Sequence, residues 1–313
     1  MELLASLRTR VHRENGVWVV RDSGPSVGIT AQFLGDAQTW AAAHCDPSYW
    51  RWLVERCLTH VQLPRSPRVL EVGCGSGDGT LAMLDVLPDS QVLASDVSPQ
   101  MLAILESRLT DARRNRLTLV CADAMTLEYV NESFDFAFGA SILHHLMEPE
   151  LLLRRLQEAL RPGAYAIFLE PYEGGNVALR LLCEHILREA DSLGVGDAMQ
   201  SMLREVAHDV EVRTECPKSD PVFQTLDDKW MFTPSRFERL GRAAGFCECR
   251  PFTTREPQNL FRDYMAMFLR LKCGLTPQSL PPGAWDIVAY YDRIFSDDLK
   301  NDIMMDGGVV FRK

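Results

Sequence analysis

The sequence predicts an α/β fold in which helices pack on both faces of a doubly wound, mostly parallel sheet. Three observations support this fold class. Between residues 67 and 171, short apolar strands alternate with amphipathic helices. A glycine-rich loop follows the first strand and opens a helix, and acidic residues end the first three strands or lie beside those ends. Strands separated by helices imply right-handed crossovers, and therefore parallel pairing.

The elements follow in a regular order. Strands are expected at residues 68–72, 91–96, 117–122, 134–140 and 165–170, with helices at 80–87, 99–109 and 149–160. The third helix is expected to stop at Arg161-Pro162-Gly163, which reads as a turn. Thr233 and Pro234 mark a capped helix start. Beyond the alternating region, long helices are expected at 173–212, further helices at 234–245, 257–272 and 284–300, and strands at 247–252 and 308–312.

The flanking segments differ from the alternating core. Residues 1–64 are expected to form an N-terminal lid, which is helical after a short apolar run at 17–20. Residues 65–313 are expected to form the ligand-binding domain, with helical insertions at about 173–234 and 253–306. We therefore predict one α/β domain with added lid and cap segments.

The composition restricts the class of protein. The chain has 313 residues, of which 46% are hydrophobic, and a net charge of −10. An acidic surface repels phosphate backbones, so nucleic acid is not an expected partner. The nine cysteines are scattered and form no C-x-x-C pair, and no run approaches the ~20 apolar residues of a membrane span. The N-terminus lacks the apolar segment of a signal peptide. We expect a cytoplasmic protein, monomeric or homodimeric, without a membrane span.

The run V-L-E-V-G-C-G-S-G-D-G, residues 69–79, carries the strongest signal. Its glycines let the backbone turn tightly and let a ligand lie against bare main chain. A dinucleotide-binding loop would need glycine where Asp78 stands, and carboxylates at both 71 and 78 suit a pyrophosphate poorly. Glu71, two places before the first glycine, can instead pair with a ligand amine. The loop therefore predicts a ligand other than NAD.

Two further acids follow the next strands. Asp96 ends the second strand, where such folds place a carboxylate on ribose hydroxyls, and Asp123 follows the third. The fourth strand runs into F-G-A-S-I-L-H-H-L, residues 138–146. Each signal is weak alone, but their order and spacing place all of them in one crevice at the carboxyl edge of the sheet.

At these motifs the sequence resembles the class I S-adenosylmethionine-dependent methyltransferases, the seven-stranded Rossmann-like group. The resemblance covers about residues 66–171 and rests on E-V-G-C-G-S-G, D-V-S-P-Q-M-L, A-D-A, F-D-F-A-F-G-A-S-I-L-H-H-L and L-R-P-G-A-Y-A-I-F-L-E-P. It implies a strand order of 3-2-1-4-5-7-6 with an antiparallel strand 7 at 308–312. It also implies S-adenosyl-L-methionine as cofactor and S-adenosyl-L-homocysteine as product.

The resemblance implies a role for each matched residue. Glu71 would lie near the methionyl ammonium, Asp96 would hold the ribose, and Asp123 would accept from the adenine amino group. The full predicted cofactor site is Glu71, Gly73, Cys74, Gly75, Asp96, Val97, Met101, Asp123, Ala124 and Ala140.

Candidates for proton transfer lie after the fourth strand and at the end of the fifth. His144, His145 or Glu170 could act as a general base for an acceptor, although the sequence favours a structural or cofactor-side role for these residues. The other histidines show no metal-ligand spacing, and the strand tips lack the carboxylate or amide ligands of metal-dependent relatives, so no metal is expected.

The sequence specifies the acceptor less closely than the cofactor. The sulfonium donor is already an electrophile, so the protein mainly aligns the acceptor and excludes water. We expect a small organic acceptor of the specialised or lipid-like kind made in natural product biosynthesis, methylated on oxygen or else on carbon or nitrogen. The candidate substrate-binding residues are Trp40, Tyr172, Trp230, Phe232 and Tyr264. Alternatives are a methyltransferase fold used for decarboxylation, cyclisation or hydrolysis, and a non-catalytic cofactor-binding subunit.

Overall fold

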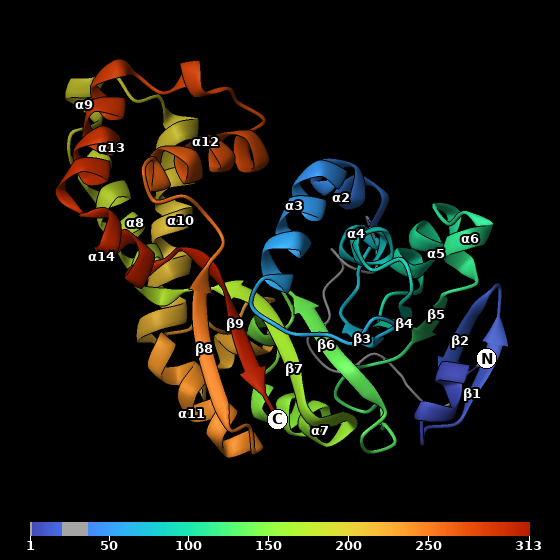
Figure 1. Ribbon diagram of the computed structural model, residues 1–313. Helices are drawn as coiled ribbons and strands as arrows, with labels where there is room; N and C mark the ends of the chain where they lie inside the picture. The colour runs from blue at the N-terminus through green and yellow to red at the C-terminus, as the bar shows by residue number, and fades with distance from the viewer. Residues whose placement is uncertain (1, 21–36) are drawn as a thin grey trace.

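The computed structural model describes residues 2–20 and 37–313. Within these ranges one mixed sheet runs in the order β1-β2-β5-β4-β3-β6-β7-β9-β8 (Figure 1). Its strands are β1 (Val11–Glu14), β2 (Val17–Val20), β3 (Arg68–Val72), β4 (Gln91–Asp96), β5 (Leu117–Cys121), β6 (Phe134–Ala140), β7 (Leu160–Pro171), β8 (Glu248–Thr253) and β9 (Asp306–Arg312). From β5 to β8 this is the order that the resemblance implies.

Strand direction also agrees with the expectation. β3, β4, β5, β6 and β7 pair in parallel, while β9 runs antiparallel to both β7 and β8. The expected turn at 161–163 is instead part of β7, where the register shifts and Gly163 has a φ of +78°. The carboxyl ends of the parallel strands therefore form one edge, where ligands bind in open α/β sheets.

The N-terminal segment differs from the helical expectation. After a short 3-10 helix at Glu2–Ser6 it forms a hairpin, in which β1 pairs antiparallel with β2, and β2 pairs parallel with β5. Asn15 and Gly16 have φ values of +47° and +88°, the left-handed pair that a tight two-residue hairpin requires. Among the described residues that follow the hairpin, helices form at α2 (Ala37–His44) and α3 (Pro47–Leu58). The Asn15-Gly16 turn and the β-branched residues after it favour a hairpin over the expected helix.

Helix boundaries follow the capping residues. Ser98 caps α5 and Thr233 caps α11, each with proline at the next position. The helix expected at 284–300 is two helices, because Ser296 accepts a hydrogen bond from the Leu299 amide and starts a new one. The sheet-packed helices are α3, α4 (Asp78–Val86), α5 (Pro99–Ser107), α6 (Asp111–Arg114), α7 (Pro149–Ala159) and α11 (Pro234–Ala244).

The sheet carries a hydrophobic core on each face. Neighbouring side chains of a strand point to opposite faces. Val69 belongs to the cluster that includes α3, α4 and α5, and Leu70 to the one that includes α7 and α11. Both side chains are fully buried, which confirms that β3 is a central strand covered on both faces.

A third core lies in a separate group of helices, which we call the cap. It comprises α8 (Glu173–Arg188), α9 (Ala190–Leu193), α10 (Asp197–Glu215), α12 (Leu260–Cys273), α13 (Pro282–Ile294) and α14 (Asp297–Ile303). Because α8 begins two residues after β7 ends, the cap stands beyond the carboxyl end of β7 (Figure 1). Among the described residues, no helix combines the length and apolar character needed to cross a membrane.

Candidate functional site

The loop between β3 and α4 offers bare backbone to a ligand. Gly73, Gly75 and Gly77 all have positive φ, at +68°, +52° and +87°. A Cβ on Gly77 would lie 2.2 Å from a carbon of Leu105, whereas one on Gly75 would meet nothing within 4 Å. Gly77 is therefore required for packing. Gly75 leaves open space above the main chain, which suits a bound nucleoside.

Asp96, at the end of β4, holds this loop. Its two carboxylate oxygens accept hydrogen bonds from the amides of Gly75 and Ser98, each at 2.8 Å. Burial raises the pKa of Asp96, and the backbone hydrogen bonds oppose that rise. Asp123, after β5, is also buried and accepts from the Met125 amide at 2.8 Å. Both carboxylates are thus pinned at adjacent strand tips.

A cavity of about 330 Å³ lies along these tips. Eight of the ten predicted cofactor residues line it: Gly73, Gly75, Asp96, Val97, Met101, Asp123, Ala124 and Ala140. The remaining wall is formed by Ser95, Ala122, Met125, Ser141, Ile142, His145, Leu146, Met147, Glu148, Asp227 and Lys229. Open backbone at Gly75 and two anchored carboxylates fit the ribose and adenine that the resemblance implies.

Two predicted cofactor residues lie behind the cavity wall. Glu71 is buried, and its Oε2 accepts a hydrogen bond from the Thr80 hydroxyl at 2.6 Å. Burial raises the pKa of Glu71 to about 8. Cys74 is also buried, which raises the pKa of its thiol well above the ordinary value. Asp78, which replaces the fingerprint glycine, pairs with Arg108 at 2.7 Å and so closes the loop from outside.

His144 and Glu170 form a buried pair beside the cavity. Glu170 accepts hydrogen bonds from the amides of Ile142, Leu143 and His144, and its Oε2 lies 2.6 Å from Nδ1 of His144. Burial disfavours a charged His144, but Glu170 and Asp228 outweigh that effect and raise its pKa to about 9. Glu170 thus holds the loop after β6.

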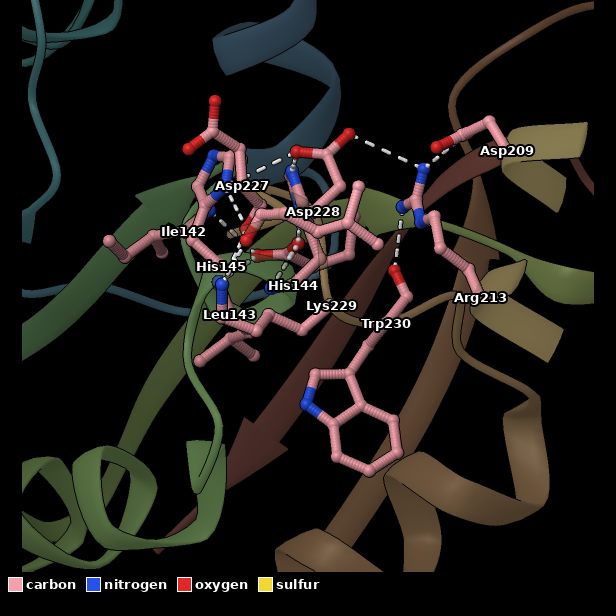
Figure 2. Close-up of polar contacts among 12 residues, drawn as sticks. Ile142, Leu143, His144, His145, Asp209, Arg213, Asp227, Asp228, Lys229 and Trp230 are labelled. Carbon is pink, nitrogen blue, oxygen red and sulfur yellow. Dashed lines mark hydrogen bonds and ion pairs between the residues drawn. The ribbon is translucent and has the colours of Figure 1, made fainter. Parts of the chain in front are cut away.

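Asp228 extends this network into the cap, as Figure 2 shows. Its Oδ1 lies 3.4 Å from Nε2 of His144 and 3.3 Å from Nδ1 of His145, while its Oδ2 lies 3.3 Å from Arg213 on α10. Burial would raise the pKa of Asp228, yet His144 and Arg213 hold it well below its usual range. Arg213 also pairs with Asp209 at 3.0 Å.

Of the three predicted proton-transfer candidates, His145 lines the cavity, and His144 and Glu170 do not. Burial and the neighbouring His144 lower the pKa of His145 to about 4. Its Nδ1 lies 3.2 Å from the carbonyl oxygen of Asp227. His145 is therefore the candidate placed to meet a ligand.

In the segment 227–230, sequence reasoning named Trp230 but missed the three residues before it, of which Asp227 and Lys229 line the cavity. The amides of Lys229 and Trp230 donate to the His144 carbonyl at 2.7 and 3.2 Å. Lys229 is buried, which lowers the pKa of its ammonium group. The sequence held no signal for Asp227, Asp228 or Lys229, because they reach the site through tertiary packing more than 80 residues after His145.

The predicted substrate-binding aromatics are not gathered at the cavity. Tyr172 and Phe232 have no exposed surface and pack in the core, where the Tyr172 hydroxyl donates to the Gly308 carbonyl at 2.9 Å. Their proposed contact with a substrate is therefore wrong in this structure. Trp230 packs beside the site without lining the cavity, and Tyr264 is buried in the cap. The side chain of Trp40 lies outside the described residues.

A family model described as "Methyltransferase domain" matches residues 69–163. Over 219 residues, the chain is 25% identical to trans-aconitate 2-methyltransferase of Variovorax paradoxus (strain S110), with 69% of this chain and 81% of that protein covered. It is 28% identical over 122 residues to demethylmenaquinone methyltransferase of Staphylococcus carnosus (strain TM300), covering 39% of this chain and 48% of that protein. The chain thus spans less than half of this second relative.

A solved structure shares the fold. It is one chain of the complex between the Haloferax volcanii Trm112 methyltransferase activator and a methyltransferase, with a TM-score of 0.53 and 15% identity. The alignment covers 88% of this chain and 97% of that one. The family match over the glycine loop and strand tips, together with the sheet order, shows that residues 69–163 belong to a methyltransferase domain of the class I S-adenosylmethionine-dependent type.

Proposed function

We propose that the cavity binds S-adenosylmethionine and that the protein transfers its methyl group to a small organic acceptor. The observation that carries this proposal is that eight residues expected to contact the cofactor line one cavity. Asp96 would hold the ribose, Asp123 the adenine amino group, and Val97 and Met101 would flank the base. Glu71, behind the loop, would pair with the methionyl ammonium.

The bound cofactor would supply an electrophilic methyl group, and the chain would align the acceptor with it and exclude water. His145, Asp227 and Lys229 form a polar wall of the same cavity. We assign contact with the acceptor to this wall. Any proton transfer is assigned to His145, because His144 and Glu170 do not line the cavity and are hydrogen-bonded to each other.

We propose oxygen as the methylated atom and a specialised metabolite as the acceptor class. One relative, which covers 69% of this chain, is named for trans-aconitate. A buried lysine in the cavity wall suits an acceptor with an anionic group. An acceptor library screened by S-adenosylhomocysteine release tests both points. Tight cofactor binding without turnover of any acceptor would contradict the methyl-transfer proposal.

Cofactor binding itself is tested by calorimetry with S-adenosylhomocysteine in EDTA. Loss of a charge-assisted contact costs about 1.5–3 kcal/mol, so Asp96→Ala should weaken binding roughly ten- to a hundredfold. Asp96→Asn retains an acceptor for the Gly75 or Ser98 amide and separates lost binding from lost loop structure. Asp89→Ala, which removes an exposed partner of Arg65, is the control. Equal binding by wild type and Asp96→Ala would refute the proposed ribose contact.

A further inference from the structure

Three ligand-type atoms converge beside the cavity from two distant segments. Nε2 of His144 and Nδ1 of His145 lie 3.4 and 3.3 Å from the same oxygen, Oδ1 of Asp228 (Figure 2). All three atoms lie within 4.8 Å of one another. His144 is buried and His145 half-buried, while the Asp228 side chain is 40% exposed. The group is therefore partly accessible to solvent, and His145 connects it to the cavity.

The tautomer of His144 follows from its other nitrogen. Glu170 already accepts from three backbone amides, so it is an acceptor towards Nδ1 as well, and Nδ1 carries the hydrogen. In a neutral imidazole Nε2 then presents a lone pair towards Asp228. Two acceptors that face each other need a cation between them, either a proton or a metal ion.

The separations distinguish these two cations. A nitrogen–oxygen hydrogen bond normally measures about 2.7–3.2 Å, and both contacts to Asp228 are longer. Ligands bound at about 2.0–2.1 Å in a tetrahedron lie about 3.3–3.5 Å apart, which matches both contacts. The two separations therefore suit a shared ion better than a shared proton.

The surrounding side chains also carry enough negative charge to balance a divalent ion. Carboxylates outnumber cationic side chains around the group: Glu170, Asp209, Asp227 and Asp228 against Arg213 and Lys229. The formal excess is two negative charges before the histidines are counted. Arg213 binds the second oxygen of Asp228 and orients it, as Glu170 orients His144. Such outer carboxylate partners are typical of histidine ligands to metals.

We propose that His144, His145 and Asp228 bind one divalent transition-metal ion of the zinc type, through two imidazoles and one carboxylate. Three protein ligands leave a coordination position open, and His145 lines the cavity, so that position would face the ligand site. The ion would join the loop after β6 to the segment 227–230, which form two walls of the cavity. This site is independent of the proposed methyl transfer, which does not require a metal.

One contact must change when the ion binds. Nδ1 of His145 also lies 3.2 Å from the Asp227 carbonyl, to which it donates in one tautomer. Metal binding at Nδ1 moves the hydrogen to Nε2 of the same ring, so this hydrogen bond is lost and the Asp227 carbonyl keeps the Lys229 ammonium group, at 3.4 Å, as its donor. The competing arrangement is a doubly protonated His144 between Glu170 and Asp228, with no metal affinity.

The test is metal binding by the full chain after removal of metals with a chelator. Calorimetry with ZnCl₂ and visible absorption with CoCl₂ should each show one equivalent bound. Asp228→Asn and His145→Gln should weaken binding about a hundredfold or more, and Glu170→Gln about ten- to a hundredfold. His185→Gln is the matched control, since His185, on α8, pairs with Glu189 just after that helix rather than with the proposed ligands.

Circular dichroism and melting curves establish that each variant is folded. The proposal is overturned if folded wild type binds neither ion at millimolar concentration, or if Asp228→Asn and His145→Gln bind as wild type does. Nitrogen NMR that finds both ring nitrogens of His144 protonated in excess zinc would also overturn it. S-adenosylhomocysteine binding in EDTA is measured separately, so failure of the metal site is distinguishable from failure of the cofactor site.

Discussion

At the scale of single residues, Gly75 and Gly163 both have a positive φ, but only Gly75 lines the cavity. Their φ values are +52° and +78°, and a Cβ on either would meet nothing within 4 Å. Gly75 lines the cavity, whereas Gly163 lies near the start of β7. Valine at either position should cost similar backbone strain, on the order of 1–2 kcal/mol.

We therefore expect Gly75→Val to abolish S-adenosylhomocysteine binding and Gly163→Val to leave it intact. Urea unfolding should show comparable losses of stability, and calorimetry should separate the two variants. If Gly75→Val binds normally, the ligand does not lie against this loop.

Glu71 predicts a pH dependence of stability. Burial raises its pKa from 4.5 to about 8, so between those values the folded state holds a proton that the unfolded chain has released. The contribution of Glu71 to stability is thus fully present below pH ~4.5 and falls as pH rises towards 8. Glu71→Gln keeps an acceptor for Thr80 and removes the titration. Its free energy of unfolding should decline less than that of wild type between pH 5 and 8, and equal declines would contradict the assignment.

At the scale of elements, the segment 227–230 is fastened to the loop after β6. The Trp230 indole donates to the Leu146 carbonyl at 2.8 Å, and Arg213 donates to the Trp230 carbonyl at 2.7 Å. Two cavity walls from distant parts of the chain therefore support each other. Since loops at strand tips move more readily than the sheet, these bonds set the shape of the cavity.

Trp230→Phe tests this fastening. Loss of one hydrogen bond should lower the free energy of unfolding by about 1 kcal/mol. Trp285→Phe is a matched control, because its indole donates to the Pro277 carbonyl at the same 2.8 Å but in the cap. We expect faster hydrogen exchange at 144–147 in the first variant alone. Identical exchange maps would show that the indole bond does not hold the cavity wall.

At the scale of the whole molecule, the cap has a hydrophobic core of its own beside the two cores of the sheet. Among the described residues, no side chain of the cap helices lines the cavity, whereas Asp227 and Lys229, from the segment after α10, do. We therefore expect S-adenosylhomocysteine to slow hydrogen exchange at 73–77, 141–148 and 227–229 and to leave α9 and α13 unchanged. Slowing throughout the cap would indicate instead that it closes as a lid over the ligand.

The sequence alone determined the central sheet and the side of the cavity that the glycine loop and strand tips form. The glycine loop, Asp96 and Asp123 follow successive strands, and parallel strands bring their carboxyl ends to one edge. Strand and helix alternation, capping residues and turn glycines are local signals, so they can be read without tertiary contacts. Asp96 and Gly75 were found for this reason, and the Asn15-Gly16 hairpin was a local signal that a helical reading of the N-terminus overlooked.

Tertiary structure alone decided the other side of the cavity. Asp228 meets His144 and His145 from a segment more than 80 residues later, so no sequence spacing predicts their contact. Tyr172 and Phe232 have the same apolar character whether they face a ligand or a core, and packing placed them in the core. A parallel sheet orders its own strand tips, but the segments that cover those tips are positioned by side-chain packing and ion pairs between elements far apart in the chain.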